Sequence, residues 1–297
     1  MDPRQVEYFL AVAECGSISA AARQLGVSQP TLSEAVARME SDLAVPLFRR
    51  QPRGVVLTGA GRDLVGPAAQ VLRAHAELKE ALRPAQHLER GRLSVVCPRT
   101  LAQDPVAELV GRFRQRYPGV VVSLLRPHGG ESAVDVVASG RAEVGIGVGN
   151  PSGTDLTSEL LTRQRVVALL HPDLDVGPSP DLADLVARGL VVTPQGGVTR
   201  RLLSECLGQR VVDEAVVVET SSTGAMVPLV RAGLGIAFVS EAMGRDAEAV
   251  GLLVRAPRPA LRRDVWLTFG ATLSPAAREF VAMARRMREA RELEPAT

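Results

Sequence analysis

The sequence contains little cysteine or histidine, with only three cysteines and four histidines in 297 residues. The cysteines, Cys15, Cys97 and Cys206, are too few and too far apart for the disulfide framework of a small secreted domain. No cysteine and histidine cluster has the spacing of a zinc site, so we expect no metal and no other cofactor. A reducing compartment therefore fits the chain better than an oxidising one.

Long apolar runs are also absent. No segment approaches the roughly 18 apolar residues that a membrane-spanning helix needs. Residues 1–7 carry acids in place of the apolar stretch of a secretory signal. We therefore expect a cytoplasmic protein without a membrane partner.

Neither sign of charge is in large excess, because 35 basic and 33 acidic residues leave a formal net charge of only +2. Composition alone therefore gives no indication of nucleic-acid binding. Positive charge is local in residues 48–62, which contain four arginines and no acidic residue. The length and the 46% hydrophobic content predict two or three folding units.

The first sixty residues show helical periodicity in three short segments. The first segment ends at Gly16, Ser17 can cap the second, and Ser28 or Gln29 can cap the third after a short glycine-containing turn. Pro30 falls in the first turn of the third helix, where its missing N–H costs little. The expected buried positions are Val6, Phe9, Leu10, Ala13, Ile18, Ala21, Ala22, Leu25, Leu32, Val36, Met39 and Leu43. This order predicts a helix-turn-helix, although a plain helical hairpin has the same periodicity.

Residues 47–58 are typical of a strand, a tight turn and a second strand, with arginines at the tip. Such a wing would place its arginines against phosphates. Opposite its apolar stripe, the third helix presents mostly small residues, which would let it sit deep in a major groove. The candidate DNA contacts are Ser28, Gln29, Pro30, Thr31, Ser33, Glu34 and Arg38 on the helix, and Arg49, Arg50 and Arg53 on the wing.

A series of motifs runs in order through this region: Tyr8–Ala13, Gly16–Ala22, Leu25–Pro30, Leu32-Ser33, Met39-Glu40, Leu47–Arg50 and Leu57–Gly61. In these motifs the chain resembles the LysR-type family of transcriptional regulators. The resemblance implies a winged helix-turn-helix whose recognition helix begins near Ser28. The chain departs from the family at Glu34, Ala35 and Ala37, where basic or amide residues are common. A glutamate can accept from cytosine N4 but repels phosphate, so the family's contact scheme does not carry over to position 34.

Thr58 can cap a long helix that runs to about Leu82. Its apolar positions step by four and three residues, which is typical of a helix that pairs with a second chain. A helix that packs on its own domain has the same spacing, and the family resemblance favours dimerisation. The predicted seam is Leu64, Ala68, Val71, His75, Leu78 and Leu82.

Two further features of this helix can be predicted. Pro67 should kink or break it, and residues 85–90 form the expected hinge. Leu72 lies off the predicted seam, so a charge there should be tolerated better than one at Val71. The resemblance also implies that the remaining domains pair dimers into a tetramer.

From Gly91 onward, short apolar runs alternate with helical segments, which predicts a mostly parallel sheet with covering helices. Residues 133–146 and 226–236 form a weak internal repeat, because each is a helix that ends at glycine before a buried strand. Two similar α/β lobes explain this repeat. The expected strands are 93–96, 120–125, 144–148, 166–170, 190–192, 215–218, 236–239 and 265–269.

The stretches Gly140–Ile146 and Leu229–Ala237 also resemble motifs of the LysR-type effector domain. The resemblance implies a fold similar to type 2 periplasmic binding proteins, with the chain crossing between lobes near 162–165 and returning near 267–270. The expected fold class is α/β. The expected parts are a winged helix-turn-helix domain (1–58), a linker helix and hinge (59–90), and a two-lobed effector domain (91–297), with lobe I at about 91–162 and 268–297 and lobe II at about 163–267.

Four loops follow predicted strands at the carboxyl edge, where α/β lobes bind ligands and helix N-termini present free N–H groups. Each loop is rich in hydroxyl residues or glycine, which suits a bound carboxylate or another polar group. Ordinary helix capping explains any one loop equally well. Arg99 and Arg200 either add positive charge there or are solvated. The candidate effector contacts are Arg99, Thr100, Gly129, Gly130, Ser132, Thr193, Gln195, Gly197, Thr199, Ser221 and Ser222.

Three other functions have weaker support. An enzyme is not favoured, because the sequence contains neither a Gly-x-Ser-x-Gly elbow nor a dinucleotide loop. His128 near Ser132 is only a weak indication of a catalytic pair. A secreted solute-binding protein is not favoured, because the N-terminal region has no apolar signal stretch and predicts a DNA-binding unit. A thiol redox sensor disagrees with the placement of Cys97 and Cys206 in different predicted lobes, and a buried inert thiol is the simpler interpretation of Cys206.

We therefore expect no catalytic residues and a regulator of transcription. Its expected partners are double-stranded DNA, a small polar or anionic effector and further copies of itself, as a homodimer or homotetramer. RNA polymerase is a further candidate partner.

Overall fold

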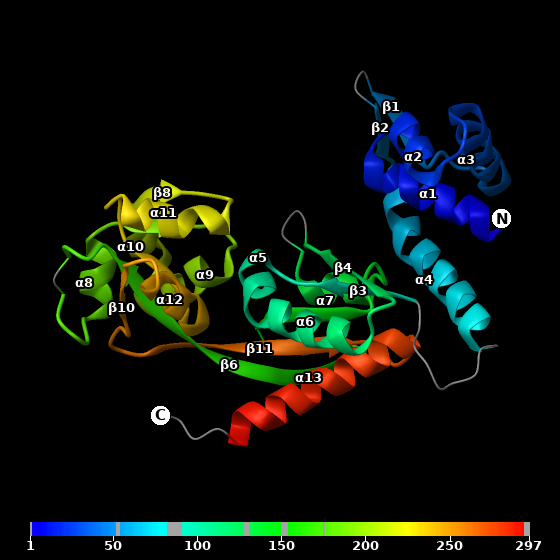
Figure 1. Cartoon of the computed structure of the whole chain (residues 1–297). Coiled ribbons are helices and arrows are strands. Elements are labelled where there is room, and N and C mark those ends of the chain that lie inside the picture. The colour runs from blue at the N-terminus through cyan, green and yellow to red at the C-terminus, as the bar shows by residue number, and fades with distance from the viewer. Residues whose placement is uncertain are drawn as a thin grey trace.

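The computed structural model describes residues 2–51, 54–81, 91–127, 131–149, 154–174 and 176–293. A small helical unit at the N-terminus leads into a long helix, and two α/β lobes follow along a pair of long strands (Figure 1). Among the described residues, no helix is both long and apolar enough to cross a membrane.

The N-terminal unit consists of three helices and a two-stranded wing. The predicted helix ends and caps are confirmed, because Gly16 takes a left-handed conformation and the hydroxyls of Ser17 and Ser28 cap the helices that follow them. Most predicted core positions are buried or half-buried, whereas Leu43 is 37% exposed. The elements are α1 (Pro3–Cys15), α2 (Ile18–Leu25), α3 (Gln29–Leu43), β1 (Phe48–Gln51) and β2 (Gly54–Leu57).

The long helix α4 (Gly59–Ala81) begins at Thr58, whose hydroxyl accepts from the Gly61 N–H at 3.0 Å. The helix is continuous through Pro67, so of the two predicted outcomes, a kink or a break, the break is wrong. Its first half packs on its own domain against α1.

The packing of α4 corrects the predicted seam. Leu64 and Ala68 contact the core of the N-terminal unit, and so does Leu72, which was predicted to lie off the seam. Val71 is 50% exposed. The expected tolerance of a charge at Leu72 is therefore wrong, because that side chain belongs to the core. The side chains of Leu78 and Leu82, and the hinge at 85–90, lie outside the described residues.

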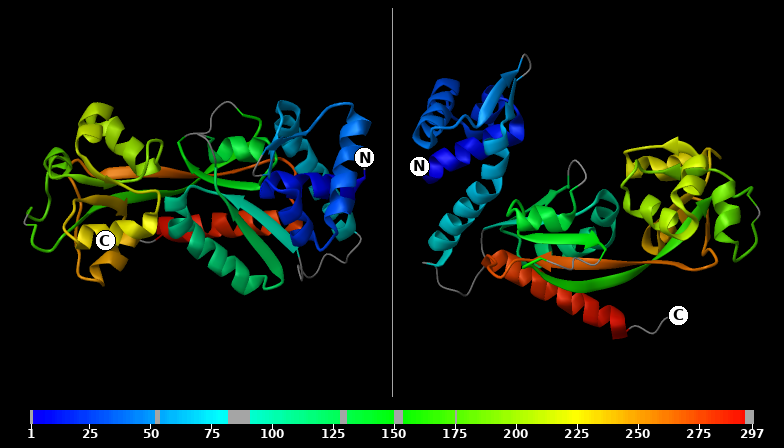
Figure 2. Two further views of the ribbon diagram at one scale, coloured as in Figure 1. Left: turned by 90° about the horizontal axis from the view of Figure 1, so that it is seen from above. Right: turned by 180° about the vertical axis from the view of Figure 1, so that it is seen from behind.

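Lobe I is a parallel sheet with helices on both faces. Strands β3 (Gly91–Val96), β4 (Val120–Leu125) and β5 (Val144–Val148) run parallel, with β3 in the middle. One face packs on α6 and α13, which lies along β3 and β6 (Figure 2). The other face packs on α7. The helical elements are α5 (Arg99–Leu101), the wide turn η1 (Ala102–Val106), α6 (Ala107–Arg116), α7 (Ala133–Ala138) and α13 (Pro275–Leu293).

Lobe II repeats this plan with shorter elements. Helices α8, α9 and α10 cover one face of its strands, and α11 and α12 cover the other. The strands are β7 (Leu190–Val192), β8 (Val216–Glu219), β9 (Ala237–Ser240) and β10 (Leu253–Arg255). The helical elements are α8 (Leu182–Ala187), α9 (Val198–Leu207), α10 (Gln209–Glu214), η2 (Thr223–Ala225), α11 (Met226–Arg231) and α12 (Glu241–Glu248). The predicted repeat is confirmed, since α7 and α11 both end at a left-handed glycine, Gly140 and Gly233, before a buried strand.

Two long antiparallel strands, β6 (Thr157–Leu170) and β11 (Leu261–Phe269), join the lobes. Leu161 and Val265 lie in the lobe I core, whereas Val166 and Leu261 lie in the lobe II core. The return crossing is therefore at 262–264 and not at 267–270. The sheet is also mixed rather than mostly parallel, because β11, β9 and β10 all pair antiparallel to β6.

Candidate functional site

The exposed face of α3 carries the residues predicted to contact DNA. Ser28, Gln29, Pro30, Thr31, Glu34 and Arg38 are exposed, and Ser33 is half-buried. The opposite face is anchored, because Leu32, Val36 and Met39 are each 5% exposed or less. The start of α3 is also fixed to α2, since the Ser19 hydroxyl donates to Gln29 Oε1 at 3.0 Å. The helix thus presents a rigid, mostly small-residue surface.

The wing is held to the helices by the Glu40 carboxylate and by close backbone packing. Glu40 Oε1 accepts from the N–H groups of Leu47 and Phe48 at 2.7 and 3.0 Å, which fixes the start of β1. At the start of β2, Gly54 has φ 140° and lies directly against the Gly16 carbonyl, so a side chain there would overlap backbone. Arg49 and Arg50 are exposed on β1, on a wing docked beside the helices. Arg53 lies outside the described residues.

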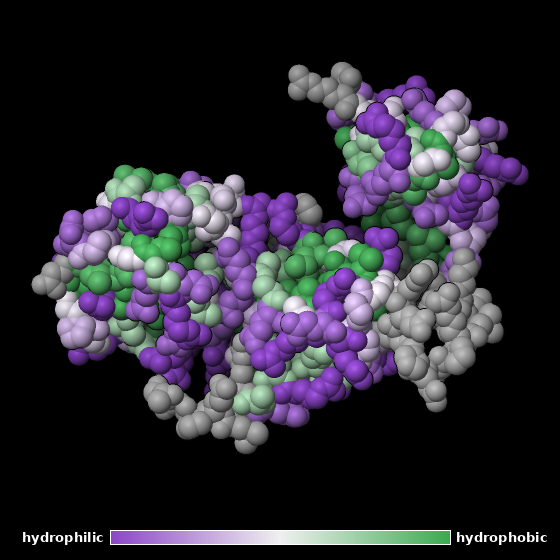
Figure 3. Space-filling view, in the orientation of Figure 1, coloured by the Kyte–Doolittle hydropathy of each residue, from purple (hydrophilic) through white to green (hydrophobic). Residues whose placement is uncertain are grey.

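A cavity of about 500 Å³ lies between the two lobes. Figure 3 shows a largely hydrophilic surface in this region. Most of the predicted effector contacts line the cavity: Arg99, Thr100, Ser132, Thr193, Gln195, Gly197 and Ser221. They come from loops of both lobes, so a molecule bound there would touch both. Gly129 and Gly130 lie outside the described residues.

Two predicted contacts do not line the cavity. Thr199 is 8% exposed, and its hydroxyl accepts from Arg263 Nη1 at 3.2 Å. Ser222 is instead held in its own loop, where its N–H donates to Thr220 Oγ1 at 3.1 Å. Neither residue is part of the cavity lining.

The cavity also has walls that the loop-based prediction missed. Trp266 and Thr268 lie on β11, on the face opposite the buried Val265 and Leu267. Their alternation was visible in the sequence, but only segments after strands were considered as ligand contacts. Further lining residues are Pro98, Arg126, Pro127, Glu131, Ala133, Val134, Gly147, Val148, Gly149, Pro194, Gly196, Val198, Arg201 and Thr223.

The cavity is predominantly cationic. Arg99, Arg126 and Arg201 line it, and the one carboxylate among its described lining residues, Glu131, is paired with Arg141 at 2.6 Å. Arg99 also donates to the Ser221 carbonyl, which joins lobe I to lobe II at the cavity. An anion would therefore be favoured over a cation here.

One polar atom of the cavity stands out. Thr100 Oγ1 is buried, and no described residue forms a hydrogen bond with it. A buried hydroxyl without a partner costs roughly 1–3 kcal/mol, so native proteins rarely retain one without a ligand or water to pair with it.

Arg200 does not supply charge to the cavity, in contrast to the alternative considered from the sequence. It is 7% exposed and pairs with Asp213 at 2.7 Å and Glu219 at 2.5 Å. Although burial opposes it, these two carboxylates raise the pKa of Arg200 overall. The cavity residue is its neighbour Arg201.

A buried polar network spans the crossing strands beside the cavity. Arg263 is 4% exposed and donates to Gln164 Oε1 at 2.8 Å as well as to Thr199. Gln164 donates in turn to the backbone and carboxylate oxygens of Asp104, both at 2.9 Å. Burial lowers the pKa of Arg263 to about 10, against the opposing charge of Asp104. The network thus connects η1 of lobe I with α9 of lobe II.

The cysteines differ in environment. Cys97 is buried, which raises the pKa of its thiol to about 11 and makes it a poor nucleophile. Cys206 is exposed, so the interpretation of Cys206 as a buried thiol is wrong. Within the described residues, no group of acidic, histidine or cysteine side chains could hold a metal ion.

Comparison with known proteins decides the family. Residues 3–62 match the model described as "Bacterial regulatory helix-turn-helix protein, lysR family", and residues 86–289 match "LysR substrate binding domain". The chain belongs to the LysR family of DNA-binding transcriptional regulators. This LysR-type regulator is therefore not an enzyme, as predicted, and the second match gives it an effector-binding domain.

Relatives of this LysR-type regulator match over most of its length. It is 30% identical to the HTH-type transcriptional regulator IlvR of Caulobacter vibrioides, covering 83% of this chain and 85% of that protein. It is 27% identical to the uncharacterized HTH-type transcriptional regulator YybE of Bacillus subtilis, covering 94% and 97%.

Solved structures share the whole fold. A full-length OxyR variant from Pseudomonas aeruginosa has a TM-score of 0.73 at 22% identity, covering 97% of this chain and 95% of that one. Full-length CbnR in complex with its target DNA has a TM-score of 0.66 at 23% identity, covering 97% and 100%. The predicted arrangement of a helix-turn-helix followed by an α/β effector domain is thereby confirmed.

Proposed function

We propose that this regulator binds a small anionic metabolite between its lobes, and that this effector controls the binding or bending of double-stranded DNA. The observation that carries the proposal is the set of three arginines that line the cavity, next to a Thr100 hydroxyl that no described residue pairs with. Hydrogen bonds to a charged group are worth roughly 1.5–3 kcal/mol each, so a carboxylate would pair with the arginines, and with Thr100 once its buried hydroxyl rotates toward the cavity.

The start of α9 supports an anion as well. Gly197 and Val198 line the cavity, and no described side chain caps this helix. The first N–H groups of a helix have no partner within it and carry partial positive charge, which favours an anion. The proposed effector contacts are therefore Arg99, Thr100, Ser132, Thr193, Gln195, Gly197 and Ser221, together with Arg126 and Arg201.

The effector can act only by favouring one arrangement of the lobes over another. Both lobes contribute to the cavity, and Arg99 already bridges them through Ser221. An anion between Arg99 and α9 would therefore favour an arrangement in which the two lobes lie close together around it.

The test uses Trp266, which is the only tryptophan of the chain and lines the cavity. Its fluorescence is titrated with small mono- and dicarboxylates, and with amines of matched size. We expect at least one carboxylate and no amine to saturate the signal, and Thr100→Val to weaken that binding by about tenfold or more, as loss of one hydrogen bond to a charge implies. Saturation by amines alone, or equal binding by Thr100→Val, would contradict the assignment.

On the DNA side, the proposed readers are the exposed residues of α3, and the proposed phosphate contacts are Arg49, Arg50 and Arg53. Arg50→Ala should weaken binding to all sequences and reduce the slope of log affinity against log salt by about one, because one phosphate contact is lost. The control is Arg112→Ala, an exposed arginine of lobe I. An unchanged slope in alanine variants of all three wing arginines would exclude the wing from phosphate contact.

We further propose that the chain acts as a homodimer or homotetramer in the cytoplasm and contacts RNA polymerase. Val71 on α4 offers one apolar position for pairing. The edge strand β4 offers another, because Val121 is 54% and Leu124 45% exposed, and an apolar patch covers this strand in Figure 3. The domain limits that we propose are 1–58, 59–90 and 91–297, with lobe II ending near 263. A monomer in light scattering at micromolar concentration would contradict this assembly.

A further inference from the structure

The long helix α4 lies directly against lobe I at Gly66. Gly66 is buried, and a Cβ atom at this position would lie 2.1 Å from the carbonyl oxygen of Ser139. The obstacle is backbone, so no side-chain rotation could remove it. The two segments therefore pack closely only because residue 66 is glycine.

Ser139 is the residue that follows α7, and the other end of α7 lies at the cavity. Glu131, Ser132 and Ala133 all line the cavity. Six residues of helix rise about 9 Å in total. The first turn of α7 thus lies at the proposed effector site, and the end of α7 lies against α4, the linker helix that follows the DNA-binding unit.

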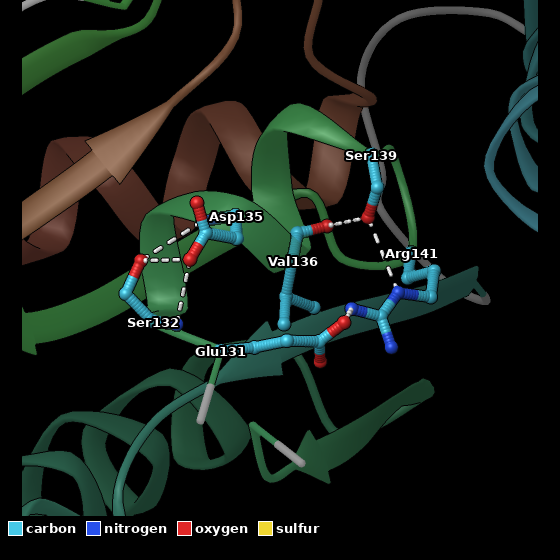
Figure 4. A network of polar contacts seen from close by, with 6 residues as sticks. All are labelled: Glu131, Ser132, Asp135, Val136, Ser139 and Arg141. Carbon is cyan, nitrogen blue, oxygen red and sulfur yellow. Dashed lines mark hydrogen bonds and ion pairs between the residues drawn. The ribbon is translucent and has the colours of Figure 1, made fainter. Parts of the chain in front are cut away.

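A side-chain strap connects the two ends of α7 (Figure 4). The Arg141 guanidinium pairs with Glu131 Oε1 at 2.6 Å and donates through Nε to Ser139 Oγ at 3.1 Å. The Ser139 hydroxyl donates to the Val136 carbonyl at 3.0 Å. Arg141 therefore contacts both the residue at the cavity wall and the residue against α4.

The helix itself is built to move as one piece. Ser132 and Asp135 close its first turn with a capping box, in which the Ser132 N–H and hydroxyl both donate to the Asp135 carboxylate at 2.8 Å. Val136 and Val137 are buried against the lobe I sheet. A displacement at the Glu131 end would consequently reach Ser139.

We propose that the contact between Gly66 and Ser139 is a joint through which lobe I holds the DNA-binding half, and that the strap of Glu131, Arg141 and Ser139 ties this joint to the cavity. The part of this inference that concerns the effector rests on the proposed function. An anion beside Glu131 meets like charge and competes for Arg141, so the strap is the part of the wall that responds to it. The coupling free energy equals the difference in the free energy of effector binding between the state in which Gly66 and Ser139 are in contact and the state in which they are apart.

The joint is tested by Gly66→Ala in the full-length protein, with hydrogen exchange as the measurement. Alanine stabilises a helix relative to glycine, so local propensity alone would slow the exchange of α4. We expect the opposite, with amides of 135–142 and of α4 around residue 66 exchanging roughly tenfold faster, because the overlap forces the segments apart. The matched control is Gly59→Ala in the same helix, where the nearest atom would be the Arg62 guanidinium at 4.0 Å.

The strap is tested from its far end. Glu131→Gln and Arg141→Gln each remove the ion pair at the cavity wall, and neither side chain is part of α4. Both should accelerate exchange of the α4 amides around residue 66, by at least about twofold. Arg112→Gln, which removes an exposed pair with Glu108 elsewhere in lobe I, should leave those amides unchanged.

The outcomes separate the two proposals. Unchanged exchange in Gly66→Ala would overturn the joint, and an α4 response to Gly66→Ala but to neither strap variant would overturn the strap. Neither experiment contains a ligand. Failure of every carboxylate to bind would therefore contradict the proposed function and leave the joint standing.

Discussion

Helices α7 and α9 both begin at the cavity, and their first turns are built differently. The start of α7 is closed by the protein's own carboxylate, because Asp135 accepts from Ser132 and completes a capping box. The start of α9 is open, with Gly197 at the cap position and no described side chain bonded to it. A helix N-terminus beside a pocket is therefore an anion site only where the chain does not already supply the anion.

The side chains in the first turn of α9 reinforce this difference. Thr199 is bonded to Arg263, and Arg200 is paired with Asp213 and Glu219. These contacts hold the helix from behind and direct the Thr199 and Arg200 side chains away from the cavity. The backbone N–H groups and the Arg201 side chain remain as the parts of α9 that a ligand can use.

The largest effect is expected from obstructing the open start. A Cβ atom at Gly197 would lie 2.0 Å from Thr193 Oγ1 and 3.0 Å from Thr193 Cβ, so Gly197→Ala must open the loop that leads into α9. Carboxylate affinity, measured by Trp266 fluorescence, should fall roughly 100-fold, as loss of two hydrogen bonds to a charge implies.

Gly111→Ala is the control for this variant, because nothing lies within 4 Å of the added Cβ atom and residue 111 is in α6. Its carboxylate affinity should equal that of the unsubstituted protein. If Gly197→Ala bound equally well, the start of α9 would not be the anion site.

A smaller effect, and one on stability, is expected from opening the closed start. Asp135→Ala should lower the free energy of unfolding by about 1 kcal/mol at pH 7, since the capping box is lost. Carboxylate affinity should change less than about twofold, because no ligand contact is removed. A loss of affinity comparable to that of Gly197→Ala would remove the distinction between the two helix starts.

The stability difference should also depend on pH. The backbone and side-chain hydrogen bonds from Ser132 lower the pKa of Asp135 below its ordinary value of 3.8. A lowered folded-state pKa stabilises fully above the unfolded value, and that stabilisation is lost as the pH falls through the folded value. In urea denaturation, the free energy of unfolding of the unsubstituted protein should therefore exceed that of Asp135→Ala at pH 7, and this difference should narrow below pH 3.8. A constant difference would show that the charge of Asp135 contributes nothing.

Local chemistry made the N-terminal unit predictable. Ser17, Ser28 and Gly16 act on their own turns, so caps and helix limits follow from neighbours in the sequence. The buried strands of the lobes were found by the same kind of local pattern.

The errors arose where distant residues decide the outcome. Thr199 turns away from the cavity because Arg263, 64 residues later, needs a partner. Leu72 rather than Val71 faces the core because α4 packs on α1, and spacing alone does not fix that side of the helix. The return crossing was misplaced because β11 is longer than its apolar run and includes Arg262 and Arg263.

The central claim is that an anion in the cavity changes the hold on DNA. The most direct measurement is the Kd for a duplex selected from a randomised pool, with and without a saturating carboxylate identified by the Trp266 titration. We predict a change of at least about fivefold in the unsubstituted protein, the lower end of usual coupling energies. At the same carboxylate concentration, Thr100→Val should show a smaller change and keep its DNA affinity without ligand. An identical Kd with and without the carboxylate, at an occupancy confirmed by fluorescence, would contradict the account.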